Sequence, residues 1–353
     1  MFSKTIFDRY FIFFLILTSV FSFSQSQFDR AFADSKRATT HKFKLEFTDT
    51  SGNETSLPVL IIKGKQTGKV FTLLAGVHGF EYPPIIAIQD MIQELNPEEL
   101  SGTLIVLPIT NMGSFYTRTP FINPLDKKNI NRIFPGDDEG TVSEQIVDFI
   151  STKIIPVSDI FLDIHGGDAS EDLLPFVCYY ENKNYPEITQ KTKELSEFSG
   201  FEYVVSYPYT IKEDEPAKYA FKQACQVGKI ALSFESGKLG NVQPEAVKRI
   251  KTGLYRLLQK LEMYDSKVAF TSPKIKKLNN QIYVRSTVQG IFYSAFKAGD
   301  EVVKGEVVGY ITDEFGEQLE EIVTPRSGTI LYMKGTPPTN SNDSLMCVSF
   351  FEN

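Results

Sequence analysis

Cysteine and histidine are both scarce in this chain, and their scarcity limits the metal sites that it can build. Its three cysteines stand far apart in the sequence, at Cys178, Cys225 and Cys347. They cannot form a CxxC metal motif or a dense disulfide framework. A transition-metal site would therefore have to combine carboxylates with the few histidines. These are His41, His78 and His165.

Positive charge is also in deficit. The 353 residues include 37 Lys and Arg against 44 Asp and Glu, which gives a formal net charge of −7. Nucleic-acid binding needs clustered Lys and Arg that release counterions from phosphates. We therefore expect no nucleic-acid partner, and instead a small molecule or a short peptide. With 42% hydrophobic residues, the chain has enough apolar material for a normal core and a length that suggests about two domains.

The one strongly apolar run stands near the N-terminus and is short. Lys4 and Arg9 precede it, and it extends from Phe11 to Phe23. A membrane-spanning helix needs about 20 apolar residues, so the pattern favours a cleaved signal peptide over residues 1–24. No cysteine follows that could carry a lipid anchor. The sequence predicts a secreted or periplasmic protein with no stable membrane span after cleavage; the alternative is that the segment is retained as an anchor.

Residues 25–270 alternate between strand-like and helical patterns. This alternation predicts an α/β fold, a mixed sheet flanked by helices on both faces. In such sheets ligands collect at the carboxyl ends of the strands. The expected strands are 59–62, 70–75, 104–108, 160–164 and 230–234, and the expected helices are 84–95, 142–154, 186–198, 216–226 and 244–263.

Residues 271–353 carry short strand patterns separated by Gly and Pro, which predict a small C-terminal all-β domain. The layout GDEVVKGEVVGYI…PRSGTI resembles the barrel-sandwich domain of lipoyl and biotinyl carriers. Those carriers need a lysine at a hairpin tip, and the corresponding stretch, Gln318–Ile322, has none. We therefore expect a structural or access-restricting appendage that is not modified.

Two histidines follow apolar strands and stand beside glycines. His78 is followed by Glu81 three residues later, and His165 ends a second predicted strand. Alone, HxxE is a weak signal, and a single histidine is more often packed or solvated. Together the three side chains predict a metal site, since catalytic zinc takes three such protein ligands and a water. Asp163 is a candidate to orient His165, whereas His41 lacks such surroundings and is expected to be solvated.

Four further polar residues are candidates for the same site. Arg118 and Arg132 would supply positive potential, and a guanidinium beside the Asn131 amide can grip a carboxylate; the alternative is that the arginines form surface ion pairs. Glu235 ends the buried strand LSFE, where desolvation would suit it to proton transfer. Its alternative role is a solvent-facing or helix-capping carboxylate.

In order along the chain, GVHGFE, NINRIFPG, DIHGG and FESG resemble the motifs of the succinylglutamate desuccinylase/aspartoacylase family over most of residues 45–345. The resemblance implies a zinc carboxypeptidase-like fold with one Zn²⁺ per chain, held by His78, Glu81 and His165. It also implies that Glu235 is the catalytic carboxylate and that Asn131 and Arg132 hold the substrate carboxylate. Arg118 resembles the arginine that polarises the scissile carbonyl.

We therefore expect a zinc-dependent deacylase that hydrolyses an N-acyl amino acid or a related small amide bearing a free carboxylate. A zinc carboxypeptidase that removes C-terminal residues from peptides would use the same groups. A non-catalytic binding protein on this fold is disfavoured, because binding alone has no need of Glu235. The sequence does not specify the acyl group, the amino acid or the oligomeric state.

Overall fold

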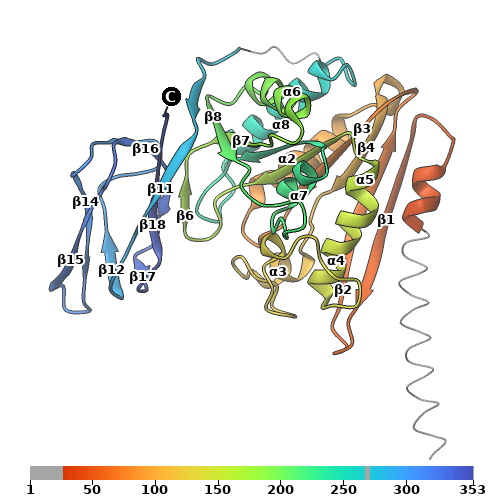
Figure 1. Ribbon diagram of the computed structural model, residues 1–353. Helices are drawn as coiled ribbons and strands as arrows, with labels where there is room; N and C mark the ends of the chain where they lie inside the picture. Colours follow the sequence, from red (N-terminus) through yellow and green to blue (C-terminus); the bar gives the residue numbers. More distant parts are fainter. Residues whose placement is uncertain (1–26, 267–270, 353) are drawn as a thin grey trace, which may run out of the picture.

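The computed structural model describes residues 27–266 and 271–352 (Figure 1). The predicted signal peptide, residues 1–24, lies outside these ranges. Within them, no helix combines the length and the apolar character that crossing a membrane would require. A short helical segment, residues 27–33, begins the described chain and packs Phe28 against Phe149.

A nine-stranded mixed sheet forms the larger part of the molecule. Its strands follow the order β1-β2-β4-β3-β5-β9-β7-β8-β10. The central pairs β4–β3, β3–β5 and β5–β9 are parallel, whereas β1–β2, β2–β4 and β7–β9 are antiparallel. The strands are β1 (Thr39–Thr48), β2 (Glu54–Lys63), β3 (Gln66–Ala75), β4 (Ser101–Leu107), β5 (Ile160–His165), β7 (Phe176–Glu181), β8 (Tyr203–Pro208), β9 (Ile230–Glu235) and β10 (Lys276–Leu278).

Helices cover both faces of this sheet, which confirms the predicted α/β class. One core joins the sheet to α2, α6 and α8, and the other joins it to α4 and α7. The buried central strands are mostly apolar on both sides, as expected of strands covered on both faces. The helices are α2 (Tyr82–Glu94), α3 (Met112–Thr117), α4 (Val142–Phe149), α5 (Ile155–Val157), α6 (Pro186–Phe198), α7 (Ala220–Gln226) and α8 (Pro244–Lys260), with the short turns η1 (Pro97–Glu99), η2 (Ile130–Arg132) and η3 (Ile150–Ile154).

Four of the five predicted helices differ from the structure at their ends. Helix α2 covers Tyr82–Glu94 instead of 84–95, and α8 ends at Lys260 instead of residue 263. The other two differ more. The helix expected over 142–154 is regular only to Phe149 and continues as the π-helical turn η3 before α5. Pro156 follows, and it has no N–H to donate to a preceding carbonyl. The helix expected from Pro216 begins only at Ala220, because Lys218 has a positive φ of 72° and pairs its backbone with Phe134.

The C-terminal residues form two further sheets around their own small core, as predicted (Figure 1, blue). One sheet has the order β11-β18-β16-β13, with β6 (Glu171–Leu173) added beside β16, and the other has the order β15-β14-β12-β17. The strands are β11 (Asn280–Arg285), β12 (Gly290–Tyr293), β13 (Glu301–Val302), β14 (Val307–Thr312), β15 (Gln318–Val323), β16 (Gly328–Lys334), β17 (Pro338–Thr339) and β18 (Ser344–Phe350).

The division between the two parts differs from the predicted boundary at residue 270. Strand β10 lies beyond that point but pairs with β8 of the large sheet, and β6 lies well before it but pairs with β16 of the C-terminal sheet. Backbone hydrogen bonding therefore ties the two parts together in both directions. The stretch Gln318–Ile322 lies in strand β15, and the turn before it, residues 313–317, contains no lysine.

Candidate functional site

Three neighbouring parallel strands bring the predicted polar residues to one edge of the large sheet. Strand β3 ends at Ala75 and leads into the loop that carries His78 and Glu81, while β5 ends at His165 and β9 at Glu235. His165 and Glu235 are register partners. Because the carboxyl ends of adjacent parallel strands meet at the same edge, these side chains come together although they lie far apart in sequence.

The chain leaves β3 through a turn that requires glycine. Gly76 has a φ of +64°, and a Cβ at this position would lie 2.9 Å from the Ile109 backbone. Glycine adopts this conformation without steric cost. The turn directs residues 77–81 back over the sheet edge before α2 begins at Tyr82.

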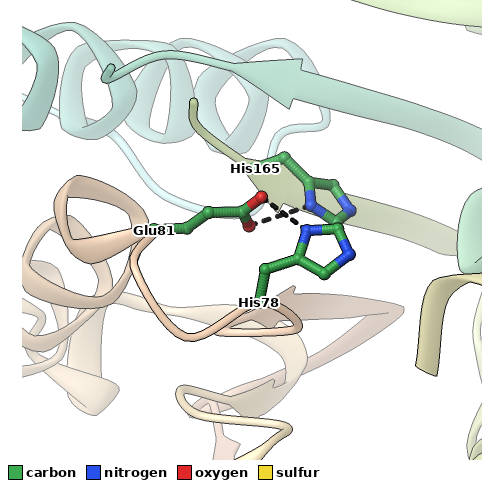
Figure 2. A group of neighbouring side chains, drawn as sticks. All are labelled: His78, Glu81 and His165. Carbon is green, nitrogen blue, oxygen red and sulfur yellow. Dashed lines mark hydrogen bonds and ion pairs between the residues drawn. The ribbon is translucent and has the colours of Figure 1, made fainter. Parts of the chain in front are cut away.

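His78, Glu81 and His165 form one compact cluster (Figure 2). His78 Nδ1 lies 2.7 Å from Glu81 Oε1, and His165 Nδ1 lies 3.0 Å from Glu81 Oε2. All three side chains are buried, and one ligating atom from each lies within 4.8 Å of the others. The structure thus brings together the three residues that the sequence singled out.

Polar residues outside the cluster contact the opposite ring nitrogens. His78 Nε2 lies 3.3 Å from Asn129 Oδ1. His165 Nε2 lies 2.9 Å from the fully buried Asp163 carboxylate, an ionic contact that lacks hydrogen-bond alignment. Such outer partners hold an imidazole in one orientation and increase its basicity as a ligand. Asn129 was not singled out in the sequence, because only the fold brings the residue before Ile130 to His78.

The electrostatics of the cluster fit a divalent metal. Although burial acts to raise it, the two imidazoles lower the pKa of Glu81 to about 2, so this carboxylate is ionised. Among the described residues no lysine or arginine pairs with Glu81. Two imidazole nitrogens and one carboxylate, facing one another in a buried site, are the donor set of catalytic zinc sites that keep a fourth position open.

Glu235 faces the same site and is only partly exposed. None of the described residues donates a hydrogen bond to its carboxylate. Burial, together with the negative charges of Glu81 and Glu171, raises the pKa of Glu235 well above its ordinary value, although His165 opposes this shift. A carboxyl group with a raised pKa can both accept and return a proton near neutral pH.

A cavity of about 390 Å³ opens over these residues. Part of its wall comes from the C-terminal strands β11 and β16. The sequence predicted a structural or access-restricting role for this domain, but no motif marked the individual wall residues. Aromatic side chains form most of the remaining wall. The lining residues include Phe121, Glu171, Phe176, Tyr180, Tyr207, Tyr219, Phe221, Gln281, Tyr283 and Tyr332, besides the cluster and Glu235.

Asn131 and Arg132 also line the cavity. The Asn131 amide oxygen is buried and has no hydrogen-bond partner among the described residues. Arg132 is exposed, and its guanidinium stacks over the Tyr219 ring at 4.9 Å. It forms no ion pair within the described part of the chain, so it is available to an incoming carboxylate at the cavity mouth.

Arg118, by contrast, is not brought into the cavity. It caps the C-terminus of α3 in a left-handed conformation, with a φ of 55°, and its side chain is exposed. The chain turns there, and three residues later Phe121 reaches the cavity wall, where its N–H donates to Asp168 Oδ2 at 2.9 Å. The placement of Arg118 therefore does not support the carbonyl-polarising role implied by the resemblance. His41 lies on β1 beside Asp34, apart from the cluster.

The model of the succinylglutamate desuccinylase/aspartoacylase catalytic domain matches residues 67–261. The N-alpha-acetyl-L-2,4-diaminobutyric acid deacetylase of Halomonas elongata is 26% identical over 315 residues, which cover 87% of this chain and 90% of that protein. A crystal structure of a succinylglutamate desuccinylase/aspartoacylase from Rhodobacter sphaeroides has a TM-score of 0.80 and 26% identity, covering 91% of this chain and 98% of that chain.

The product-bound ectoine utilization protein EutE (DoeB) of Ruegeria pomeroyi shares the fold, with a TM-score of 0.79 at 22% identity over 90% of this chain and 97% of that chain. These likenesses span both the large sheet and the C-terminal strands. The motif order, the cluster at the edge of the sheet and the matched catalytic-domain model lead to the same conclusion. The chain belongs to the succinylglutamate desuccinylase/aspartoacylase family.

Proposed function

We propose that this protein is a zinc-dependent amidohydrolase that removes the acyl group from a small, carboxylate-bearing N-acyl amino acid. The observation that carries the proposal is the presence, in one cavity, of the His78–Glu81–His165 cluster and the otherwise unbonded carboxylate of Glu235. The deacetylase activity of the Halomonas elongata relative supports the same reaction type.

His78, Glu81 and His165 would hold one zinc ion per chain. When bound, zinc supplies the Lewis acidity that makes water a nucleophile near neutral pH. The Asn129 and Asp163 contacts keep both imidazoles turned toward Glu81. The protein contributes a ligand set that is already assembled, so little reorganisation is needed for binding.

Glu235 would handle the proton in this reaction. As a carboxylate it accepts a proton from the attacking water, and as a carboxylic acid it returns that proton to the leaving amide nitrogen. Its position at the end of β9, in register with His165, places it beside the metal cluster. Breaking the amide without protonating the nitrogen would expel a poor leaving group, so both halves of this proton transfer are needed.

Arg132 and Asn131 would bind the free carboxylate of the substrate. A guanidinium at the cavity mouth and a buried amide together can fix a carboxylate in one orientation. The aromatic wall, including Tyr283 and Tyr332, would exclude bulk water around the amide. We leave Arg118 without a role in this scheme.

The proposal is tested by measuring hydrolysis of a panel of N-acyl amino acids, N-blocked peptides and free peptides by the zinc-loaded protein. We expect release of amino acid from one or more N-acyl amino acids, loss of activity with chelator and recovery with zinc. Preferential cleavage of blocked peptides would instead indicate a carboxypeptidase. Stoichiometric zinc without turnover of any panel member would contradict the proposed enzyme.

A further inference from the structure

Besides Glu81 and Glu235, the cavity contains a third carboxylate, Glu171, that the proposed hydrolysis does not use. It begins strand β6, between the large sheet and the C-terminal sheet, and it lines the cavity together with Glu235. Its side chain is half-buried. A carboxylate in such a place needs a reason, because removing a charge from water without a partner costs several kcal/mol.

Glu171 is held firmly at this position. Its N–H donates to Asp168 O at 2.9 Å, its carbonyl accepts from Leu239 N–H at 2.8 Å, and its Oε2 accepts from Asp168 N–H at 3.1 Å. Among the described residues no group donates to Oε1. A glutamine side chain could accept the same hydrogen bond from Asp168 N–H. The local fold therefore explains why residue 171 has a hydrogen-bond acceptor, but it does not explain why that acceptor is negatively charged.

The neighbouring lysines are already paired with other carboxylates. Lys334 stands opposite Glu171 in the β6–β16 ladder, but its ammonium lies 2.7 Å from Asp343. Lys238 lies 2.8 Å from Asp172, the residue next to Glu171. Within the described chain Glu171 therefore forms no ion pair, although Lys334 faces it across the strand pair and Lys238 pairs with the next residue. Burial, with the nearby charges of Glu81 and Asp168, raises the pKa of Glu171, as expected for a carboxylate without a countercharge.

Aromatic groups of the C-terminal strands stand at the same cavity wall. Tyr283 and Tyr332 have ring centroids 6.1 Å apart, and Tyr332 is paired in register with Leu173 of β6, two residues after Glu171. Tyrosine rings attract cations over their faces. Among the described residues that line the cavity, Arg132 is the one lysine or arginine, and it forms no ion pair with Glu171. One cavity thus holds a guanidinium and a carboxylate that each lack an ion-pair partner among the described residues.

We propose that Glu171 binds an ammonium group of the substrate, so that the preferred N-acyl amino acid carries a positive charge besides its carboxylate. This inference rests on the proposed function. The ammonium could stand on the side chain of the amino acid, as in a diamino acid, or on the acyl part, as in the free α-amino group of a dipeptide. Both sources would present an ammonium group to the Glu171 carboxylate. Pairs of isosteric substrates, one charged and one uncharged, distinguish the two.

The first pair is Nα-acetyl-L-2,4-diaminobutyrate and Nα-acetyl-L-norvaline, which differ by an ammonium in place of a methyl group on the side chain. The second pair is L-alanyl-L-norvaline and N-(2-methylpropanoyl)-L-norvaline, which differ by an α-ammonium in place of a methyl group on the acyl part. In the zinc-loaded wild-type protein we expect kcat/KM to favour the charged member of one pair by about tenfold or more, the effect of one charge-assisted hydrogen bond. Equal rates within both pairs would overturn the inference.

E171Q keeps an acceptor for Asp168 N–H and removes the charge. We expect it to reduce the preference to about twofold or less, mainly by raising KM for the charged substrate, with zinc content unchanged. The matched control is E181Q, the same substitution at an exposed position on β7 outside the cavity lining, which should keep the preference. A preference that persists in E171Q would also overturn the inference.

A binding measurement separates this inference from the proposed function. If neither these four compounds nor any member of the N-acyl amino acid panel is hydrolysed, the deacylase proposal fails. Calorimetry of the zinc-loaded protein then decides the role of Glu171 by measuring dissociation constants. It compares L-2,4-diaminobutyrate with L-norvaline, and L-alanyl-L-norvaline with its uncharged counterpart from the second pair. Tighter binding of a charged member that is lost in E171Q supports the ammonium site, and equal binding within both pairs rejects it. The comparison of charged and uncharged ligands in the wild-type protein remains informative even if E171Q does not fold.

Discussion

Glu235 owes its proposed role to its surroundings. It lies one strand away from a buried His–Glu–His cluster, with a second carboxylate, Glu171, near enough to affect its pKa. An ordinary exposed glutamate is ionised at neutral pH and is a weak base. Burial and neighbouring negative charge make Glu235 a stronger base, and a bound cation would partly reverse the shift.

Replacing Glu235 with glutamine should remove the base and leave the metal ligands in place. We expect E235Q to bind zinc stoichiometrically and to lose at least about 10²-fold in kcat, the lower end of general-base contributions. Elemental analysis and steady-state kinetics measure the two quantities separately. Normal turnover in E235Q would end the assignment of Glu235.

The three histidines provide an internally controlled test of the metal site. H78A and H165A should each abolish stoichiometric zinc, because each removes one of only three protein ligands. H41A should retain zinc, since His41 lies on β1 beside Asp34 and outside the cluster. Zinc content after dialysis checks all three variants. Unchanged zinc in H78A or H165A would exclude that residue as a ligand.

Individual elements are stabilised by local signals that can be tested independently of the site. Helix α4 follows Thr141, whose N–H donates to Glu144 Oε2 at 3.0 Å, while Lys128 lies 3.0 Å from the other oxygen. Such a reciprocal N-terminal arrangement satisfies a backbone donor that the helix leaves free. Although burial acts to raise it, these contacts lower the pKa of Glu144 below its ordinary value.

A lowered pKa in the folded state means that Glu144 stabilises the protein above its ordinary pKa of 4.5 and loses this effect as the pH falls through the lowered value. Gln keeps an acceptor for Thr141 N–H but removes the charge that faces Lys128, so we expect E144Q to reduce the free energy of unfolding by up to about 1 kcal/mol at pH 7 and by much less below pH ~4. Denaturant unfolding at both pH values measures the difference. E139Q, at an exposed site in the same loop, should be neutral, and a pH-independent loss in E144Q would contradict the explanation.

At the scale of the whole molecule, the C-terminal sheets complete the cavity as well as covering part of the large sheet. Strand β6 leaves the catalytic part to pair with β16, and β11 brings Gln281 and Tyr283 to the cavity wall. Substrate selection is therefore expected to depend on residues of both the large-sheet part and the C-terminal part of the molecule. The same pairing restricts independent movement of the two parts.

Removing a wall residue of the C-terminal part should weaken substrate binding without affecting the metal. We expect Y283A to raise KM about 3–10-fold, consistent with the loss of one aromatic contact, while zinc content stays unchanged. Y293A removes a similarly exposed tyrosine from β12, outside the cavity lining, and should leave KM unaltered. An unchanged KM in Y283A would show that this wall does not contact substrate.

Export remains a prediction from residues 1–24. In a bacterial host with a secretory pathway, we expect the mature protein to lack these residues and to leave the membrane fraction. Mass spectrometry and N-terminal sequencing of each cell fraction provide the measurement. A full-length chain retained in the membrane would favour the uncleaved anchor.

Much of the fold and of the His78–Glu81–His165 cluster could be predicted from sequence, because their signals are local. Apolar periodicity marked the central strands, and glycine-flanked histidines at strand ends marked His78 and His165. Parallel pairing then brings those ends together by a general rule of such sheets. The strands β7 and β8 and the start of α7 were missed, since their conformations depend on neighbours distant in the chain.

What the sequence determined by itself is the inventory of chemistry: too few cysteines for a thiolate site, three histidines, and one motif that couples a histidine to a glutamate. The tertiary structure alone decided which other side chains surround that cluster. It leaves Arg118 outside the cavity. It brings in Glu171 and Tyr332 through the β6–β16 pairing, and Tyr283 through strand β11, which pairs with β18. The physical reason is that the histidine motifs stand at the ends of parallel strands, and a general rule brings such strand ends to one edge of the sheet. A cavity wall depends instead on contacts between residues more than a hundred positions apart in the sequence.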